Sequence, residues 1–230
     1  MKAILFDFGG TLDSNGTACK EIFRKIYKQC SLEIEQEKFD RAFYDADDNL
    51  PKKHNLQNLT FKQTFKLQIK DVLNNLKIGN ELVADKILDV YLTETRKYFK
   101  QNVLVLAELK KNYKLAVISN FFGNLNSVLE SEGLIKYFDV TADSSIIGSV
   151  KPDSKIFMHV LSEINMQAEN SLMVGDSVKR DIMGATALNM KSALLWGDRF
   201  EQGAPPKNIQ HTVVLKNLSE LPKKLKEVNF

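Results

Sequence analysis

The sequence predicts an α/β fold in which helices cover both faces of a parallel β-sheet and an all-helical segment is inserted after the first strand. Two observations support the sheet. Short apolar runs typical of buried strands alternate with amphipathic helical patterns, and polar side chains follow several of these runs. A third supports the insertion, because the alternation stops after Asp13 and resumes only at about Lys114.

The first expected strand covers residues 3–6 and ends at Asp7. The sequence Gly9-Gly10-Thr11 then predicts a sharp turn, because glycine tolerates the backbone angles that tight turns require. After a helix containing Leu104–Leu109, further strands are expected near residues 115–119, 138–141, 171–174, 193–196 and 212–215.

Four amphipathic helices are expected in the inserted segment, around residues 18–30, 39–46, 61–76 and 83–91. Thr60 followed by Gln63 matches a capping box at the start of the third helix, and Asn80 is a candidate cap for the fourth. The four helices predict a small separate bundle. Gly16 and the segment around Gln101 are the expected hinges.

The composition is ordinary for a globular enzyme. The chain has 230 residues, of which 43% are hydrophobic and 27% charged, and its net charge of +3 gives no indication of a nucleic-acid tail. Cys19 and Cys30 are too few for a disulfide framework and are expected to be free thiols in a reducing compartment. No secretory signal and no apolar run of membrane-spanning length is recognised, so a cytoplasmic enzyme is expected.

Four polar clusters are expected at one edge of the sheet. They are Asp7 with its turn, Ser119-Asn120, Lys151 before a helix over residues 156–164, and Gly175-Asp176 with Asp181 five residues on. In an open α/β sheet, ligands bind at the carboxyl ends of the strands. A carboxylate beside turn amides suits an anionic substrate, either as a nucleophile or as a metal ligand.

These clusters, in this order, resemble the four signature motifs of the haloacid dehalogenase-like (HAD) hydrolase superfamily, and the resemblance covers nearly the whole chain. It implies a Rossmann-like α/β core made of residues 1–14 and 100–230, with residues 15–99 as a helical cap over the active site. It also implies a Mg²⁺-dependent phosphatase that acts through an aspartyl-phosphate on a small phosphorylated, or otherwise anionic, metabolite. We expect a monomer or homodimer that binds neither nucleic acid nor membrane.

The resemblance assigns a role to each motif residue. Asp7 is the nucleophile, Lys151 bridges it to the phosphate, and Ser119 donates to a phosphate oxygen. Further phosphate donors are expected in Asn120 and in the amides of Gly10 and Thr11. The expected Mg²⁺ ligands are Asp7, the backbone carbonyl of Gly9, Asp176 and Asp181.

One position departs from the family pattern. Phosphatases of this family typically carry a general-acid Asp two residues after the nucleophile, where this chain has Gly9. Asp13 is expected to lie past the turn and not to replace that acid. Loss of such a group typically lowers the rate by about 10²–10⁴-fold, so we expect a slower or more selective phosphatase that takes the proton from substrate, water or cap.

Three alternatives remain open. A dehalogenase also lacks the second Asp but usually lacks the Gly-Asp metal site as well. A phosphonatase would need a cap lysine, for which Lys52 and Lys53 beside His54 are candidates. A weakly active binding or regulatory protein is the third. The cap residues Arg24, Lys52, Lys53 and His54 are candidates for substrate contacts, and Phe121-Phe122 and Trp196 are candidates for the pocket wall.

Overall fold

The computed structural model describes residues 2–206, 209 and 212–227, and its centre is a parallel six-stranded sheet. The strand order is β3-β2-β1-β4-β5-β6, so the first strand is central. The strands are β1 (Ala3–Phe6), β2 (Lys114–Ser119), β3 (Val140–Asp143), β4 (Ser171–Gly175), β5 (Lys191–Leu195) and β6 (Thr212–Leu215). The predicted α/β fold is therefore confirmed, because parallel neighbours need the long helical connections that the sequence pattern indicated.

Helices cover both faces of the sheet, because alternate side chains of each buried strand point to opposite sides. Ile4 and Phe6 of β1 belong to the larger apolar core, which α4, α5 and α9 help to form, whereas Ala3 and Leu5 face a smaller core with α7 and α8. After β2 the α-helices are α5 (Leu125–Ser131), α6 (Ser144–Ile147), α7 (Ser154–Glu163), α8 (Met183–Thr186) and α9 (Leu221–Glu227). The shorter turns are η1 (Ile135–Tyr137), η2 (Ala168–Asn170), η3 (Val178–Ile182, a π-helix), η4 (Gly197–Glu201) and η5 (Leu218–Glu220).

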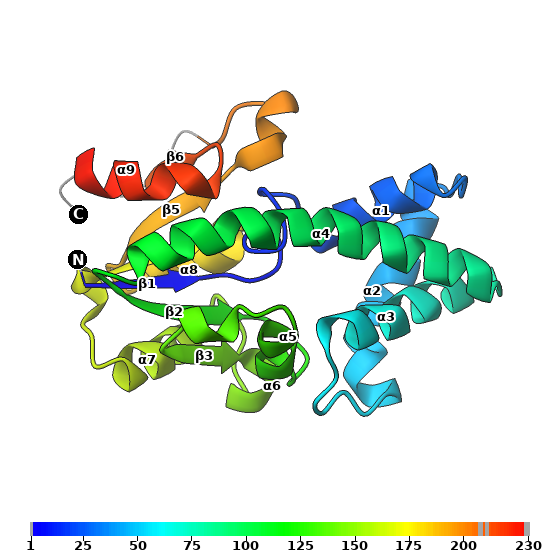
Figure 1. Ribbon diagram of the computed structural model, residues 1–230, viewed down its shortest axis with the longest axis horizontal. Coiled ribbons are helices and arrows are strands. Elements are labelled where there is room, and N and C mark those ends of the chain that lie inside the picture. Colours follow the sequence, from blue (N-terminus) through cyan, green and yellow to red (C-terminus); the bar gives the residue numbers. More distant parts are fainter. Residues whose placement is uncertain (1, 207–208, 210–211, 228–230) are drawn as a thin grey trace.

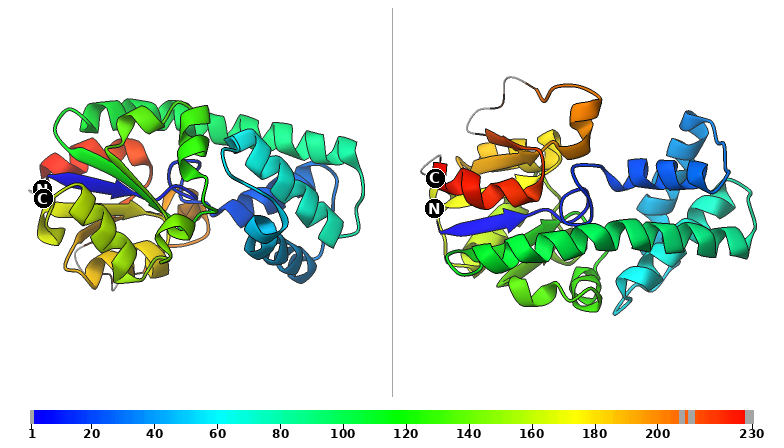
Figure 2. Two further views of the ribbon diagram at one scale, coloured as in Figure 1. Left: turned by 90° about the horizontal axis from the view of Figure 1, so that it is seen from below. Right: turned by 45° about the horizontal axis from the view of Figure 1, so that its top comes forward.

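The inserted segment forms helices beyond one end of the sheet, as Figures 1 and 2 show. They are α1 (Cys19–Gln29), α2 (Gln36–Lys53), α3 (Phe61–Asn75) and α4 (Glu81–Leu109). The predicted capping box of Thr60 and Gln63 is present at the start of α3, and the Asn80 side chain caps α4. An aromatic cluster joins α1, α3 and α4, with the Phe23 and Tyr91 ring centroids 4.9 Å apart.

Helix α4 differs from the sequence prediction. Two helices separated by a hinge near Gln101 were expected, but one 29-residue helix runs unbroken through that position and spans both parts of the molecule (Figure 1). The reason is local, since residues 81–109 contain neither proline nor glycine and nothing interrupts the helix. A division into a core of residues 1–14 and 100–230 and a cap of residues 15–99 stays a prediction.

Two other expectations concern the chain as a whole. Cys19 and Cys30 are free thiols, as predicted. Within the described residues, no helix combines the length and the apolar character that crossing a membrane would require.

Candidate active site

Three of the four polar clusters meet because their strands are neighbours. Strands β2 and β4 flank β1, and Phe6 is in register with Val117 on one side and Val174 on the other. Asp7 follows β1, Ser119 ends β2 and Asp176 follows β4, so all three lie at the carboxyl edge of the sheet. All three side chains are buried, and burial of the two carboxylates is unusual unless they are paired or functional.

Lys151 brings the fourth cluster into the same site. Its ammonium Nζ lies 2.6 Å from Asp7 Oδ1 and 2.7 Å from Asp181 Oδ1, and all three side chains are buried. Burial alone would lower the pKa of Lys151, but the charges of Asp181 and Asp7 outweigh it, so the net shift is upward and the ammonium stays protonated. The contact with Asp7 matches the role that the resemblance assigns, whereas the contact with Asp181 was not foreseen.

The carboxylates of Asp7, Asp176 and Asp181 form a cluster that fits a divalent cation. Each offers an oxygen, and these oxygens lie within 4.8 Å of one another. Burial raises the pKa of Asp7 to about 6 and that of Asp176 to about 8, and carboxylate repulsion adds to both shifts. Asp176 Oδ1 is buried and has no hydrogen-bond partner among the described residues. An oxygen-only donor set with excess negative charge is what Mg²⁺ prefers.

Two glycines allow these carboxylates to approach the backbone closely. Gly10 has a φ of +89°, and a Cβ there would lie 2.6 Å from the Asp176 carboxyl carbon. A Cβ on Gly175 would overlap the Asp181 carboxylate, whose Oδ2 accepts a hydrogen bond from the Ser177 amide at 2.9 Å. Both positions therefore require glycine because a side chain would displace a candidate metal ligand.

The turn after β1 differs from expectation in its hydrogen bonds. The Gly10 amide donates to Asp13 Oδ1 at 2.6 Å, and the Thr11 amide donates to the Phe8 carbonyl at 3.3 Å. Both amides therefore have partners within the turn, and their predicted role as phosphate donors stays a prediction. The turn uses them to satisfy its own backbone groups.

Asn120 has a positioning contact in place of the expected free donor. Its Oδ1 accepts from the Lys151 amide at 2.7 Å, and its Nδ2 donates to the Lys151 carbonyl at 3.1 Å. This pair of bonds fixes the loop that carries Lys151 to the end of β2. Asn120 still lines the pocket beside Ser119, whose role as a phosphate donor stays a prediction.

The pocket is a cavity of about 180 Å³ between the sheet edge and helices α1–α3. Its floor contains Asp7, Gly9, Ser119 and Lys151 from the core. Its remaining wall is formed by Phe8, Asp13, Ala18, Cys19, Lys20, Phe43, Tyr44, Asp47, Phe65, Gln68, Asn120, Phe121, Phe122 and Arg180. A buried lysine and carboxylates at the end of a concave pocket with both polar and aromatic walls are the features of a small-molecule active site.

Comparison with known proteins agrees with this geometry. The model of the haloacid dehalogenase-like hydrolase family matches residues 1–189. The chain belongs to this family. Haloacid dehalogenase-like hydrolase domain-containing protein 3 of Mus musculus is 27% identical over 192 residues, which cover 81% of this chain and 76% of the mouse protein.

Two further similarities extend the comparison. The pyrimidine 5'-nucleotidase YjjG of Escherichia coli is 35% identical over 121 residues, and the match spans about half of each chain, 52% in both cases. The crystal structure of a HAD phosphatase from Thermococcus onnurineus has a TM-score of 0.57 at 22% identity and covers 98% of both chains. The structural likeness shows that this hydrolase shares the fold.

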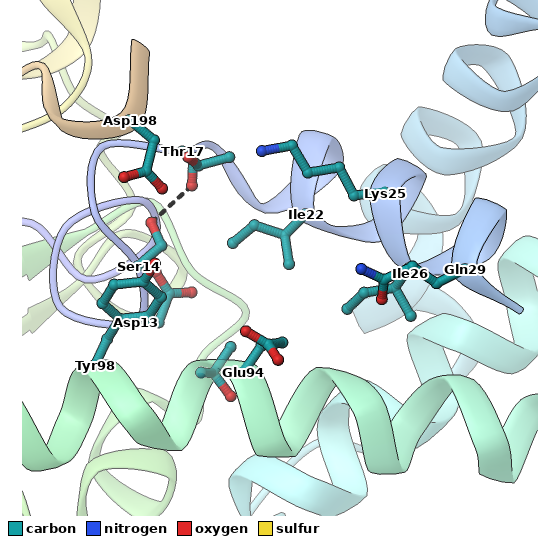
Figure 3. Close-up of a pocket in the computed structure, with 11 residues that line it drawn as sticks. Asp13, Ser14, Thr17, Ile22, Lys25, Ile26, Gln29, Glu94, Tyr98 and Asp198 are labelled. Atoms are coloured by element: carbon teal, nitrogen blue, oxygen red, sulfur yellow. Dashed lines mark hydrogen bonds between the residues drawn. The ribbon is translucent and has the colours of Figure 1, made fainter. Parts of the chain in front are cut away.

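Asp13 was expected only to lie past the turn, but it also lines the active-site pocket of this hydrolase. It is 1% exposed and lines the same pocket as Asp7, and its Oδ2 has no partner among the described residues. Burial raises the pKa of Asp13 to about 7, and the charge of Asp7 contributes to the shift. Asp13 also borders a second cavity of about 120 Å³ between the turn, α1 and α4, where Ser14 donates to the Thr17 carbonyl (Figure 3).

The cap residues that line the pocket are not those expected from sequence. Arg24 pairs with Glu21, Lys52 donates to Asn49, and neither lines the pocket. The same holds for Lys53, His54 and Trp196. Phe121 and Phe122 do line it, as predicted, together with Lys20, Asp47 and Gln68, which the sequence did not single out. Helical periodicity shows which face of a helix is apolar, but not which polar residue at its border meets the sheet.

Proposed function

We propose that this hydrolase is a Mg²⁺-dependent phosphatase of a small phosphorylated metabolite and that it acts through an aspartyl-phosphate at Asp7. The observation that carries the proposal is the Lys151 ammonium held 2.6 Å from Asp7 at the end of the pocket. A carboxylate can attack a phosphoryl group only where positive charge offsets the repulsion between two anions. The name of the E. coli relative, a nucleotidase, supports phosphate chemistry.

The residues would share the reaction as follows. A carboxylate oxygen of Asp7 forms a bond to phosphorus while the bond from phosphorus to the leaving alkoxide breaks, and water then hydrolyses the acyl phosphate. Lys151 keeps Asp7 ionised and Ser119 donates to a phosphate oxygen. Asp7, Asp176, Asp181 and the Gly9 carbonyl would hold Mg²⁺. When bound, that ion supplies positive charge for the phosphoryl oxygens.

The leaving alkoxide needs a proton that residue 9 cannot supply. A Cβ on Gly9 would have no atom within 4 Å, so the pocket is open where related phosphatases carry their acid. We therefore expect turnover to depend strongly on the acidity of the leaving alcohol. Phosphate esters of acidic phenols need little protonation, whereas alkyl esters need much.

The alternatives have weaker support. A phosphonatase would need an uncharged cap lysine in the pocket, and the only cap lysine among the lining residues is Lys20. Partial burial lowers the pKa of Lys20, but the hydrogen bond to Asp40 raises it by more, so the net shift is upward. Lys20 therefore stays charged and is a poor candidate for that role. A dehalogenase would have no use for the buried carboxylate cluster of Asp7, Asp176 and Asp181.

A cytoplasmic location and a monomeric or homodimeric state belong to the proposal.

The direct test is phosphate release from an aryl phosphate and from a panel of small phosphorylated metabolites, with Mg²⁺ and with EDTA. We expect Mg²⁺-dependent release from the aryl ester and slower release from alkyl esters. Undiminished release in EDTA would contradict the metal assignment. No release from any ester would exclude a phosphatase and favour the binding-protein alternative.

A further inference from the structure

The cap end of the pocket contains an acidic group without a cationic partner. Asp47 of α2 is half-buried, and its Oδ1 accepts a hydrogen bond from Gln68 Nε2 of α3 at 2.6 Å. Gln68 is 1% exposed, and its own amide oxygen is buried without a partner in the described part of the chain. Gln68 therefore fixes the Asp47 side chain in the pocket wall but leaves its charge uncompensated.

The charged groups around Asp47 do not neutralise it. No lysine, arginine or histidine nitrogen of the described residues lies within 4.0 Å of its carboxylate. Lys20 and Arg180 also line the pocket, but Lys20 Nζ is 2.9 Å from Asp40, and Arg180 on η3 is exposed and lies beyond 4.0 Å from the Asp47 carboxylate. Burial and the neighbouring Asp48 raise the pKa of Asp47 to about 6 although the charge of Arg180 lowers it, so the carboxylate is still mostly ionised at neutral pH. A half-buried carboxylate in this state is stabilised by a cation that pairs with it directly.

Aromatic rings line the same cavity as this carboxylate. Phe43, Tyr44 and Phe65 of the cap and Phe121 and Phe122 of the core line the same cavity. The faces of such rings attract ammonium groups, and aromatic pockets are a common means of binding them. The wall already holds one ammonium of the protein itself, because Lys20 Nζ lies 5.0 Å from the centroid of the Tyr44 ring.

We propose that Asp47, held by Gln68 in a cavity that these rings also line, is a subsite for an ammonium group of the substrate. The inference rests on the proposed phosphatase function for the other end of the pocket. The substrate would then be a phosphomonoester whose alcohol carries an ammonium group, with its phosphate at Asp7 and Lys151 and its cation at Asp47. Both groups line one cavity of about 180 Å³, so a single small ester could contact both.

Two matched substrate pairs test the subsite. The pairs are choline phosphate with 3,3-dimethylbutyl phosphate and 2-aminoethyl phosphate with propyl phosphate. Each pair keeps its shape and changes the charge. For at least one pair we expect the wild-type kcat/KM to favour the cationic ester by about tenfold or more. Asp47→Asn should lower that preference by about tenfold, because asparagine can still accept the Gln68 hydrogen bond but has no charge. Any preference that remains reflects the more acidic leaving alcohol of the cationic esters.

Asp48→Asn is the control, because it removes the same charge from an exposed neighbouring residue on α2 that does not line the pocket. It should keep the preference. Equal kcat/KM values within both pairs, or a preference that is as large in Asp47→Asn as in the wild type, would overturn the subsite. Equal thermal stabilities of the two variants would exclude a folding defect as the cause.

A binding measurement separates this inference from the proposed function. Calorimetric dissociation constants for the same four esters are measured with the Asp7→Asn variant, in which turnover is blocked. A cationic preference of about tenfold that disappears in the Asp7→Asn, Asp47→Asn double variant supports the subsite even if the wild type releases no phosphate. Equal dissociation constants would reject the subsite even if the wild type is an active phosphatase.

Discussion

The two ends of the active-site pocket differ in how their charges are paired. At the core end, Lys151 lies within 2.7 Å of both Asp7 and Asp181, and all three are buried. At the cap end, the neutral Gln68 is the only hydrogen-bond partner of the Asp47 side chain among the described residues. The charges at the core end are therefore paired and positioned before a ligand binds, which favours catalysis. The cap end instead has an unpaired carboxylate that a cationic ligand could pair with.

The largest expected effect is at the core end. Asp7→Asn should lower the rate of phosphate release by roughly 10⁴-fold or more, because asparagine is not a nucleophile for phosphorus. The assay is the initial rate on an aryl phosphate with Mg²⁺. A variant that retains full activity would mean that Asp7 is not the nucleophile.

Lys151→Met tests the pairing itself. Removal of a buried cation leaves Asp7 and Asp181 uncompensated, so we expect the free energy of unfolding at pH 7 to fall by about 3–5 kcal/mol. Lys20→Met at the cap end is the matched control. Lys20 is partly exposed at the pocket wall and pairs with Asp40, so its loss should change the free energy by no more than about 1 kcal/mol. Urea denaturation measures the free energy of unfolding of each variant. Equal losses in Lys151→Met and Lys20→Met would refute the difference between the two ends.

Gly9→Asp should restore a proton donor at the core end. The open space around a Cβ at this position leaves room for the side chain. We expect release from alkyl phosphates to rise by up to about 10²-fold and release from aryl phosphates to change much less. An unchanged or lower alkyl rate in a folded variant that binds Mg²⁺ would show that the missing acid does not limit turnover.

Asp13→Asn should affect stability in a pH-dependent way. The pKa of Asp13 is about 7 in the folded chain and about 4 when unfolded, so between these values only the folded state keeps the proton. The wild-type free energy of unfolding therefore loses this contribution as pH rises from about 4 to about 7. Asparagine does not titrate, so the variant should gain up to a few kcal/mol over wild type across this window. Urea denaturation in EDTA at pH 5 and pH 8 measures the gain, and a pH-independent difference would contradict it.

The smallest expected effect is in the cap. Thr60→Ala removes the capping box of α3 and should lower the free energy of unfolding by about 1 kcal/mol. Because Thr60 does not line the pocket, kcat should stay at the wild-type value. A large loss of activity at unchanged stability would show that the start of α3 takes part in turnover.

Local sequence patterns were enough to predict the α/β class, the bounds of β1 and β6, the caps at Thr60 and Asn80, and the group of strand-end residues around Asp7. These follow from local periodicity and from the rule that parallel strands end at one edge. Tertiary structure alone decided that Lys151 also bonds Asp181, that the Gly10 amide is used by Asp13, and that Asp47 and Gln68 reach the pocket. These contacts join residues from separate elements or from an irregular turn, and side-chain placement there depends on packing that no local pattern encodes.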